Sequence, residues 1–163
     1  MTDKEELMKE LKEKFETCQE ETGFKSSFDE LNGIFFIKDS VLDSGFVSDR
    51  FSRQLSSRIV ETYMNWANYL HGLVMPNPQS MINMHEGKMF SDGEVRKGIM
   101  SLITKTMALV STNTKVGLTK NKKDEADFID EAVRFWREDF NPEILKIIEK
   151  VNSDWRADAE KED

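Results

Sequence analysis

The stretch of sequence that decides the fold is residues 48–78, SDRFSRQLSSRIVETYMNWANYLHGLVMPNP. Apolar residues recur along it every three or four positions, which is the spacing of one face of an α-helix. A second stripe beside the first makes the apolar surface wide enough to contact two neighbouring helices. The first stripe is Phe51, Leu55, Ile59, Thr62, Trp66, Leu70 and Leu73, and the second is Val60, Met64, Ala67, His71 and Val74. Ser48 can cap this helix, and Pro76 and Pro78 end it because proline lacks an amide hydrogen.

The same spacing predicts a helix at the N-terminal end, over residues 3–22. Its single apolar stripe consists of Met8, Leu11, Phe15 and Cys18. Gly23 is the expected stop, because glycine readily adopts the left-handed conformation that ends many helices. The remaining positions are mostly charged or polar, so this helix is expected to bury one side only.

The next segment, residues 28–42, has two interpretations. Ser27 followed three residues later by Glu30 forms a capping box, a pattern typical of a helix start. The alternative concerns residues 34–37, IFFI, because the preceding Asn-Gly pair favours a turn and a short apolar run also fits a buried strand. We expect a helix, in keeping with the neighbouring segments, and leave residues 34–37 open between helix and strand.

The second half of the chain is expected to form four further helices. The first two cover residues 79–88 and 91–110, the latter opened by a second capping box. The apolar stripe then fades over residues 112–123, so a mobile loop or frayed helix end is expected there. Asp124 is expected to cap a helix that runs to Phe140. Asn141 is then expected to cap a last helix with Pro142 at its first position, which proline favours.

Together these segments predict an all-α protein, a single-domain helical bundle of about six or seven helices, four of them long. Its length of 163 residues suits one domain. We expect the bundle to cover residues 1–155 and residues 156–163 to be a solvated, acidic C-terminal tail. One cysteine cannot form an intrachain disulfide, which favours the cytoplasm. No apolar run approaches the length of a membrane span, and the acidic N-terminus does not resemble a secretory signal.

Charge is unevenly distributed over this chain, whose formal net charge is −8. Residues 91–123 carry a net charge of +5 and residues 124–163 a net charge of −8. Complementarity within the molecule explains this distribution best. The basic residues that remain candidates for phosphate contacts are Lys115, Lys120, Lys122 and Lys123. Nucleic-acid binding is not favoured, because no aromatic residue lies among these lysines, and imitation of nucleic acid by the acidic segment is also less favoured.

A cluster on the central helix is more polar and aromatic than a bundle interior normally is. Its members are Tyr63, Trp66, Asn68, Tyr69 and His71. This composition fits a ligand pocket or an interface, although Tyr and Trp also serve as boundary residues of a core. We expect His71 to be buried, neutral and hydrogen-bonded.

A possible metal site lies in the short helix over residues 79–88. Thioether and imidazole groups suit Cu(I), and the candidate ligands are Met81, Met84 and His85. The favoured interpretation is instead that these methionines fill a gap in the core. The sequence contains no pattern of a zinc, di-iron, phosphate-loop or nucleophile-elbow site, and Cys18 is expected to be inert. We therefore expect no cofactor.

From these features we expect a non-enzymatic protein that acts by protein–protein interaction or regulation, through a partner protein or as a homo-oligomer. Two apolar seams have the spacing needed to join chains. They are Met8, Leu11, Phe15 and Cys18 at one end, and Ile144, Ile148, Val151 and Trp155 at the other. The alternative is a small-molecule- or metal-binding bundle, with or without enzymatic activity, whose site lies beside the central helix.

Overall fold

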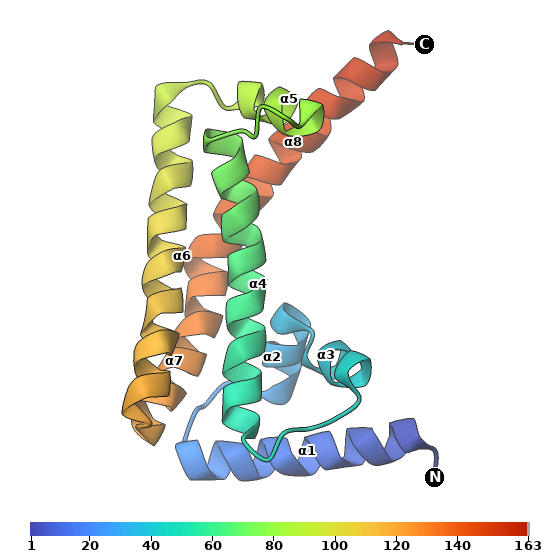
Figure 1. The fold of residues 1–163 in the computed structure, drawn as a ribbon, viewed down its shortest axis with the longest axis vertical. Helices are drawn as coiled ribbons and strands as arrows, with labels where there is room; N and C mark the ends of the chain where they lie inside the picture. Colours follow the sequence, from blue (N-terminus) through green and yellow to red (C-terminus); the bar gives the residue numbers. More distant parts are fainter. Residues whose placement is uncertain (163) are drawn as a thin grey trace. The chain divides into compact units, whose positions relative to one another are not determined.

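The computed structural model describes residues 1–162, and this part of the chain consists of helices and short connections without any strand. In chain order the elements are α1 (Asp3–Thr22), α2 (Phe28–Phe35), α3 (Ile37–Ser44), α4 (Phe51–Val74), α5 (Met81–Met89), α6 (Gly93–Thr119), α7 (Lys122–Phe135), the π-helical turn η1 (Trp136–Phe140) and α8 (Asn141–Lys161) (Figure 1). The predicted all-α class is confirmed. The strand considered for residues 34–37 is wrong, because only Phe36 lies outside a helix there.

The chain divides into two compact units. The first consists of Met1–Tyr63 and Leu109–Phe135, and the second of Met64–Ala108 and the chain from Trp136 onward. Two of the three boundaries fall inside α4 and α6. Continuous helices rather than linkers therefore pass from one unit to the other.

Both ends of α1 lie where the sequence pattern places them. Thr2 Oγ1 accepts a hydrogen bond from the amide of Glu5, and the Glu5 carboxylate accepts one from the amide of Thr2. At the other end, Gly23 has a φ angle of 89°, in the left-handed region that glycine adopts without strain. The predicted extent of this helix is confirmed.

The single helix predicted for residues 28–42 is wrong in one respect, because the structure breaks it at Phe36. This residue has left-handed backbone angles (φ 55°, ψ 49°), and it separates α2 from α3. In one continuous helix, Phe35 and Ile37 would point about 200° apart around the axis. The break allows both to be buried, with exposed fractions of 0% and 2%, while Phe36 itself stays exposed.

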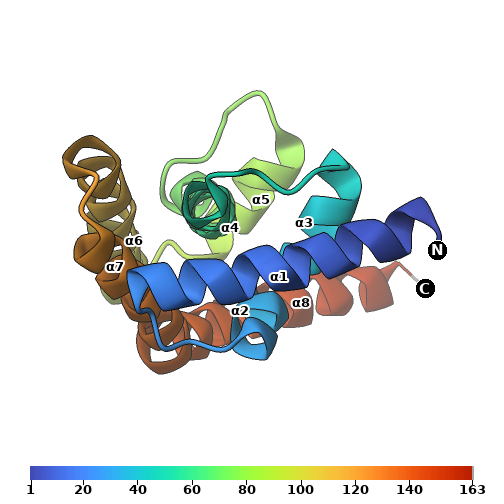
Figure 2. The same ribbon diagram turned by 90° about the horizontal axis from the view of Figure 1, so that it is seen from below.

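Aromatic side chains build the core of the first unit around α1. Phe15 makes edge-to-face contacts with Phe24, Phe28 and Phe51, with ring centroids 5.5, 5.2 and 6.2 Å apart. Helix α1 packs against α3 and α7, and Figure 2 shows α1, α2 and α3 side by side. The apolar stripe predicted on α1 therefore packs inside its own unit.

In the second unit, one side chain fixes the connection between α4 and α5. Asn83 Nδ2 donates a hydrogen bond to the carbonyl oxygen of Gly72 at 3.1 Å, and its Oδ1 accepts one from the amide of Asn77. Ser80 Oγ accepts a hydrogen bond from the amide of Asn83, which caps α5. The short helix predicted for residues 79–88 is confirmed, shifted slightly along the chain.

Of the two alternatives expected for residues 112–123, the mobile loop is wrong, because α6 continues through most of this segment and only two residues connect it to α7. Val116 is buried on the core side of the helix. Gly117, which indicated a break, instead makes room for Arg53, since a β-carbon at position 117 would stand 3.1 Å from Arg53 Nη2. The chain reverses only at Lys120, which has a φ angle of 55°.

The helices predicted on either side of Asn141 are joined without a loop. Helix α7 passes into the π-helical turn η1, and α8 follows with Pro142 in its first turn. The wider π turn accommodates a proline that cannot donate an α-helical hydrogen bond. Asn141 therefore does not cap α8. Asp124 does not cap α7 either, because the Asn121 side chain accepts a hydrogen bond from the amide of Asp124.

Candidate functional site

A groove of about 710 Å³ opens between α1, α2 and the start of α3, within the first unit. We call it the α1 groove. Its lining combines apolar, charged and polar side chains: Met8, Leu11, Lys12, Phe15, Glu16, Gln19, Lys25, Ser27, Phe28, Asp29 and Lys38. None of these residues belongs to the cluster that the sequence indicated on α4.

The floor of the α1 groove is apolar. Met8, Leu11 and Phe15 share one face of α1 because three or four residues separate them, and Phe28 joins them from the first turn of α2. Leu11 and Phe15 are buried, whereas Met8 and Phe28 are half-buried. Two of the four floor side chains therefore keep apolar surface that a ligand can cover.

The rim of the α1 groove carries charges from four successive segments. Lys12 and Glu16 come from α1, Lys25 from the following connection, Asp29 from α2, and Lys38 from α3. Within residues 1–162, none of the three lysine ammonium groups forms an ion pair. Three exposed positive charges therefore surround an apolar floor.

Lys14, on the same helix, shows how a paired lysine differs from the rim lysines. Its Nζ atom lies 2.9 Å from Glu10 Oε1 and 3.1 Å from Asp49 Oδ1, and it donates to the carbonyl oxygen of Val47 at 2.9 Å. These hydrogen bonds, first to Glu10 and then to Asp49, raise the pKa of Lys14. The rim lysines have no such acceptors in the described chain, so a ligand can supply them.

Two rim lysines sit on an anchored backbone. The amide of Lys25 donates a hydrogen bond to Asp130 Oδ2 at 2.9 Å, and the amide of Lys38 donates to Asn32 Oδ1 at 2.9 Å. Only the side chains then need to be ordered when a ligand binds, which lowers the entropic cost of binding.

The aromatic residues that the sequence indicated on α4 lie in separate surroundings. Tyr63 is fully buried in the first unit and donates its hydroxyl to the carbonyl oxygen of Ala132 at 2.5 Å, and desolvation raises its pKa. In the second unit, Trp66 meets Tyr69 edge-to-face, with centroids 6.1 Å apart. The Tyr69 hydroxyl donates to Glu86 Oε1 at 3.5 Å, and burial together with this carboxylate raises the pKa of Tyr69 to about 12.

His71 and Asn68 are exposed, so the prediction that His71 is buried and hydrogen-bonded is wrong. The neighbouring helices cover only part of the second apolar stripe of α4, leaving Ala67 and Val74 buried but not His71 between them. A periodic pattern shows which residues share a face, but not how much of that face is covered. The predicted cluster does not form one shared pocket wall.

The three candidate metal ligands on α5 also differ in their surroundings. The Met81 side chain is 86% exposed, whereas Met84 and His85 are half-buried. His85 Nε2 lies 2.8 Å from Asp158 Oδ2, and its ring lies 4.5 Å from that of Trp155. Within residues 1–162, no group of three or more His, Cys, Asp or Glu side chains is placed to hold a metal. The sequence missed Asp158, which lies in the predicted tail.

The four basic candidates lie on structured chain. Lys115 is on α6, Lys120 is in the connection, and Lys122 opens α7 together with Lys123. Lys123 Nζ lies 2.9 Å from Asp127 Oδ2, which raises the pKa of Lys123. One of the four charges is thus directed at a carboxylate of its own helix.

Comparison with known proteins yields no match to any family model, curated protein or solved structure. None of the helices in residues 1–162 combines the length and apolar character needed to cross a bilayer. The α1 groove is therefore the feature of this chain that indicates a function most directly.

Proposed function

We propose that this chain is a binding module rather than an enzyme, and that its α1 groove receives an acidic amphipathic helix of a partner protein. The observation that carries the proposal is the combination of an open apolar floor with three rim lysines that have no ion pair in the described chain. The free, buried thiol of Cys18 supports a reducing location, and we propose the cytoplasm.

A helix suits this groove because its floor is itself a helical stripe. Met8, Leu11 and Phe15 extend over two turns of α1, about 10 Å along its axis. A partner helix that presents apolar residues at similar spacing can lay them along this stripe and against Phe28. Burial of the exposed parts of Met8 and Phe28 then supplies apolar contact area.

Acidic residues on the partner helix suit the rim. Lys12, Lys25 and Lys38 are gathered here although residues 1–30 as a whole carry a net charge of −5. Glu16 and Asp29 occupy the same rim, so a uniformly acidic helix meets repulsion as well as attraction. The partner is therefore a helix whose carboxylates are spaced to meet the lysines.

The decisive experiment measures fluorescence anisotropy of a labelled acidic amphipathic peptide titrated with the protein. We expect saturable binding that weakens by about tenfold in the variant Lys12→Glu/Lys25→Glu/Lys38→Glu. The matched control is Lys88→Glu/Lys105→Glu/Lys115→Glu, which changes the net charge equally at exposed positions outside the groove. No saturable binding, or equal weakening in both variants, would contradict the proposal.

Self-association is the competing use of the apolar seams. Leu11, Phe15 and Cys18 are buried within the first unit, and Ile144 and Val151 are buried in the second. We therefore expect light scattering to give a mass near 18.9 kDa at micromolar concentration. A stable dimer that the lysine triple variant disrupts would show instead that the groove receives a second copy of this chain.

A further inference from the structure

We propose that a second cavity of the first unit, independent of the α1 groove, binds a free mononucleotide. This cavity, of about 400 Å³, lies on the solvent side of the first turns of α4 and is bordered by α3 and the α3–α4 connection. We call it the arginine pocket. Its lining includes Phe46, Arg50, Arg53, Ser57, Arg58 and Glu61. The phosphate of the nucleotide would meet Arg50 and Arg58, and its base would stack on Phe46.

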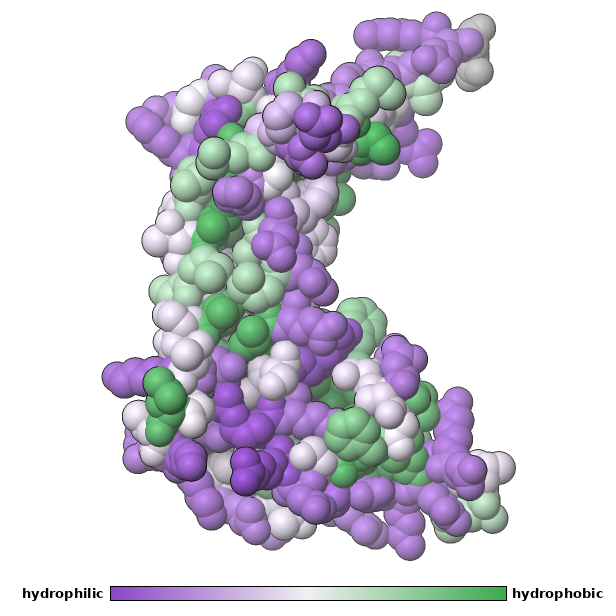
Figure 3. Space-filling model, in the orientation of Figure 1, coloured by the Kyte–Doolittle hydropathy of each residue, from purple (hydrophilic) through white to green (hydrophobic). Residues whose placement is uncertain are grey.

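The helical spacing of α4 brings the polar residues of the pocket together. Arg50 directly precedes α4, and Ser57, Arg58 and Glu61 follow it at intervals close to two and three turns. All four therefore lie on the side of α4 that faces away from its buried stripe. Figure 3 shows hydrophilic surface over the first turns of α4, beside a hydrophobic patch over the connection that follows α3. The pocket therefore joins a charged wall to an apolar one.

The arginines retain unused donors. Arg58 donates from Nε to the carbonyl oxygen of Phe35 at 2.7 Å, and its Nη1 lies 3.3 Å from Glu61 Oε2. Its Nη2 and the whole guanidinium of Arg50 make no hydrogen bond within the described chain. Arg58 is thus held in place by two contacts while another side of its planar group stays open to an anion.

Arg53 borders the pocket but directs its charge elsewhere. Its buried Nη1 atom forms an ion pair with Glu125 Oε1 of α7 at 3.7 Å. Its Nη2 atom lies beside Gly117 of α6, whereas the lining of the pocket comes from α3, α4 and the connection between them. Arg50 and Arg58 are therefore the two side chains that would meet a phosphate.

Phe46 is placed as a stacking surface rather than as part of the core. Its side chain is 56% exposed, although large aromatic groups usually pack inside. The Gln54 side chain anchors the connection that carries Phe46. Its Oε1 accepts a hydrogen bond from the amide of Ser48 at 2.8 Å, and its Nε2 donates one to the carbonyl oxygen of Phe46 at 3.2 Å. An aromatic face on an anchored backbone beside arginines is the arrangement that binds a base and its phosphate.

Charge favours a small nucleotide over a nucleic-acid strand. Arg58 is paired with Glu61 and Arg53 with Glu125, whereas Arg50 forms no ion pair within residues 1–162. Arg50 therefore supplies the available positive charge of the lining, and the N-terminal end of α4 adds the positive end of a helix dipole. A long polyanion would in addition meet the field of a chain with a net charge of −8. A mononucleotide presents one phosphate to the local positive charge and one base to Phe46.

Isothermal titration with adenosine 5′-monophosphate tests this site. We expect saturable binding, weaker binding of both adenosine and ribose 5-phosphate, and a loss of roughly tenfold in each of the variants Arg50→Gln and Phe46→Leu. Arg156→Gln is the matched control, because this exposed arginine of α8 undergoes the same charge change outside the pocket. Circular dichroism verifies that each variant is folded.

Four results would overturn the proposal. The first is the absence of saturable nucleotide binding at millimolar concentration, and the second is an equal loss of nucleotide affinity in Arg50→Gln and Arg156→Gln. The third is that ribose 5-phosphate binds as tightly as the nucleotide. The fourth is that a single-stranded oligonucleotide binds while the mononucleotide does not. The groove peptide and the nucleotide are measured separately, so failure of one site leaves the other unaffected.

Discussion

Gly87 of α5 lies so close to the ring of Pro76 that a β-carbon at position 87 would overlap Pro76 Cγ. We expect Gly87→Ala to lower the free energy of unfolding by about 1–3 kcal/mol, because neither the proline ring nor the helix can move aside easily. This is opposite to the usual effect of the substitution, since alanine has the higher helix propensity. Denaturant titration followed by circular dichroism measures the change.

Gly98→Ala is the matched control for this substitution. Gly98 lies within α6 and is exposed, and within residues 1–162 a β-carbon added at this position would have no neighbour within 4 Å other than the backbone of its own helix. Helix propensity alone then acts, and we expect stabilisation by about 0.5–1 kcal/mol. Equal effects of the two substitutions would show that Pro76 does not restrict position 87.

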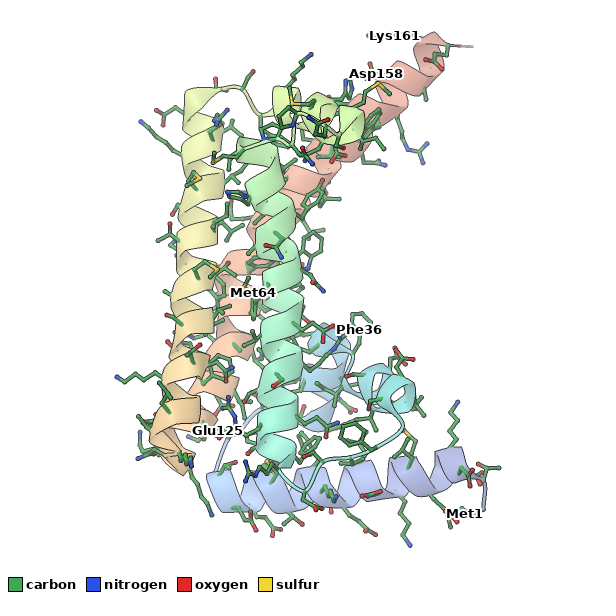
Figure 4. The ribbon with its side chains drawn as sticks, viewed as in Figure 1. Met1, Phe36, Met64, Glu125, Asp158 and Lys161 are labelled. Carbon is green, nitrogen blue, oxygen red and sulfur yellow. The ribbon has the colours of Figure 1, made fainter. Side chains whose placement is uncertain are left out.

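The left-handed backbone conformation of Phe36 is expected to lower the free energy of unfolding. This residue has a φ angle of 55°, and Figure 4 shows it at the junction of α2 and α3. Left-handed angles cost a non-glycine residue about 1 kcal/mol, and the exposed ring offers little packing in return. We expect Phe36→Gly to be more stable than Phe36→Ala by about 1 kcal/mol in thermal unfolding. Equal stability of the two variants would exclude strain at this position.

Asp130 joins α7 to the connection between α1 and α2. Its carboxylate accepts hydrogen bonds from the amides of Lys25 and Ser26 and from Ser26 Oγ, at 2.7–3.0 Å. We expect Asp130→Ala to cost about 2–4 kcal/mol of unfolding free energy, because several donors lose their acceptor at once. The control is Asp127→Ala, which removes an exposed ion pair with Lys123 and is expected to cost about 0.5 kcal/mol or less.

Cys18 is expected to react slowly with alkylating reagents. Burial is the main cause that raises the pKa of this thiol from 9.0 to about 11, assisted by the negative charges of Glu125 and Glu21. At pH 8 the reactive thiolate is therefore about 100-fold scarcer than in an unfolded chain. Iodoacetamide labelling followed by mass spectrometry, with and without denaturant, measures the ratio of rates.

The same shift predicts a pH dependence of stability. Above about pH 9 the unfolded chain releases the thiol proton while the folded chain retains it, so the free energy of unfolding falls until about pH 11. We expect this component of the decline to be absent in Cys18→Ala, when each variant is compared with its own stability at pH 8. Identical pH profiles would contradict the raised pKa.

Local patterns in the sequence were sufficient to predict where several helices begin and end. The Ser27 cap, the glycine at position 23 and the stripe of the central helix each act through neighbours within a few residues. The burial of Leu11 and Phe15 was predictable for the same reason, since a three- to four-residue spacing defines one face of a helix. This face became the floor of the α1 groove.

The rim of that groove could not be predicted from spacing. Lys12, Lys25 and Lys38 lie on different elements, and only the packing of α1, α2 and α3 brings them around one cavity. The exposed position of His71 had the same origin, because a stripe does not show how far the neighbouring helices cover it. Periodicity shows which side chains share one face of a helix, whereas a binding site depends on how several helices pack together.

The sequence by itself determined that this protein is all-α, because apolar spacing and helix caps are local properties of the chain. Tertiary structure alone decided the break at Phe36, because Phe35 and Ile37 on either side of it are both buried in the core. It also decided that α6 continues past Gly117, where the absence of a side chain leaves space for Arg53. It also decided which charges surround a cavity and which are paired. These features depend on contacts between residues far apart in the chain, and the energies of such contacts outweigh local preferences.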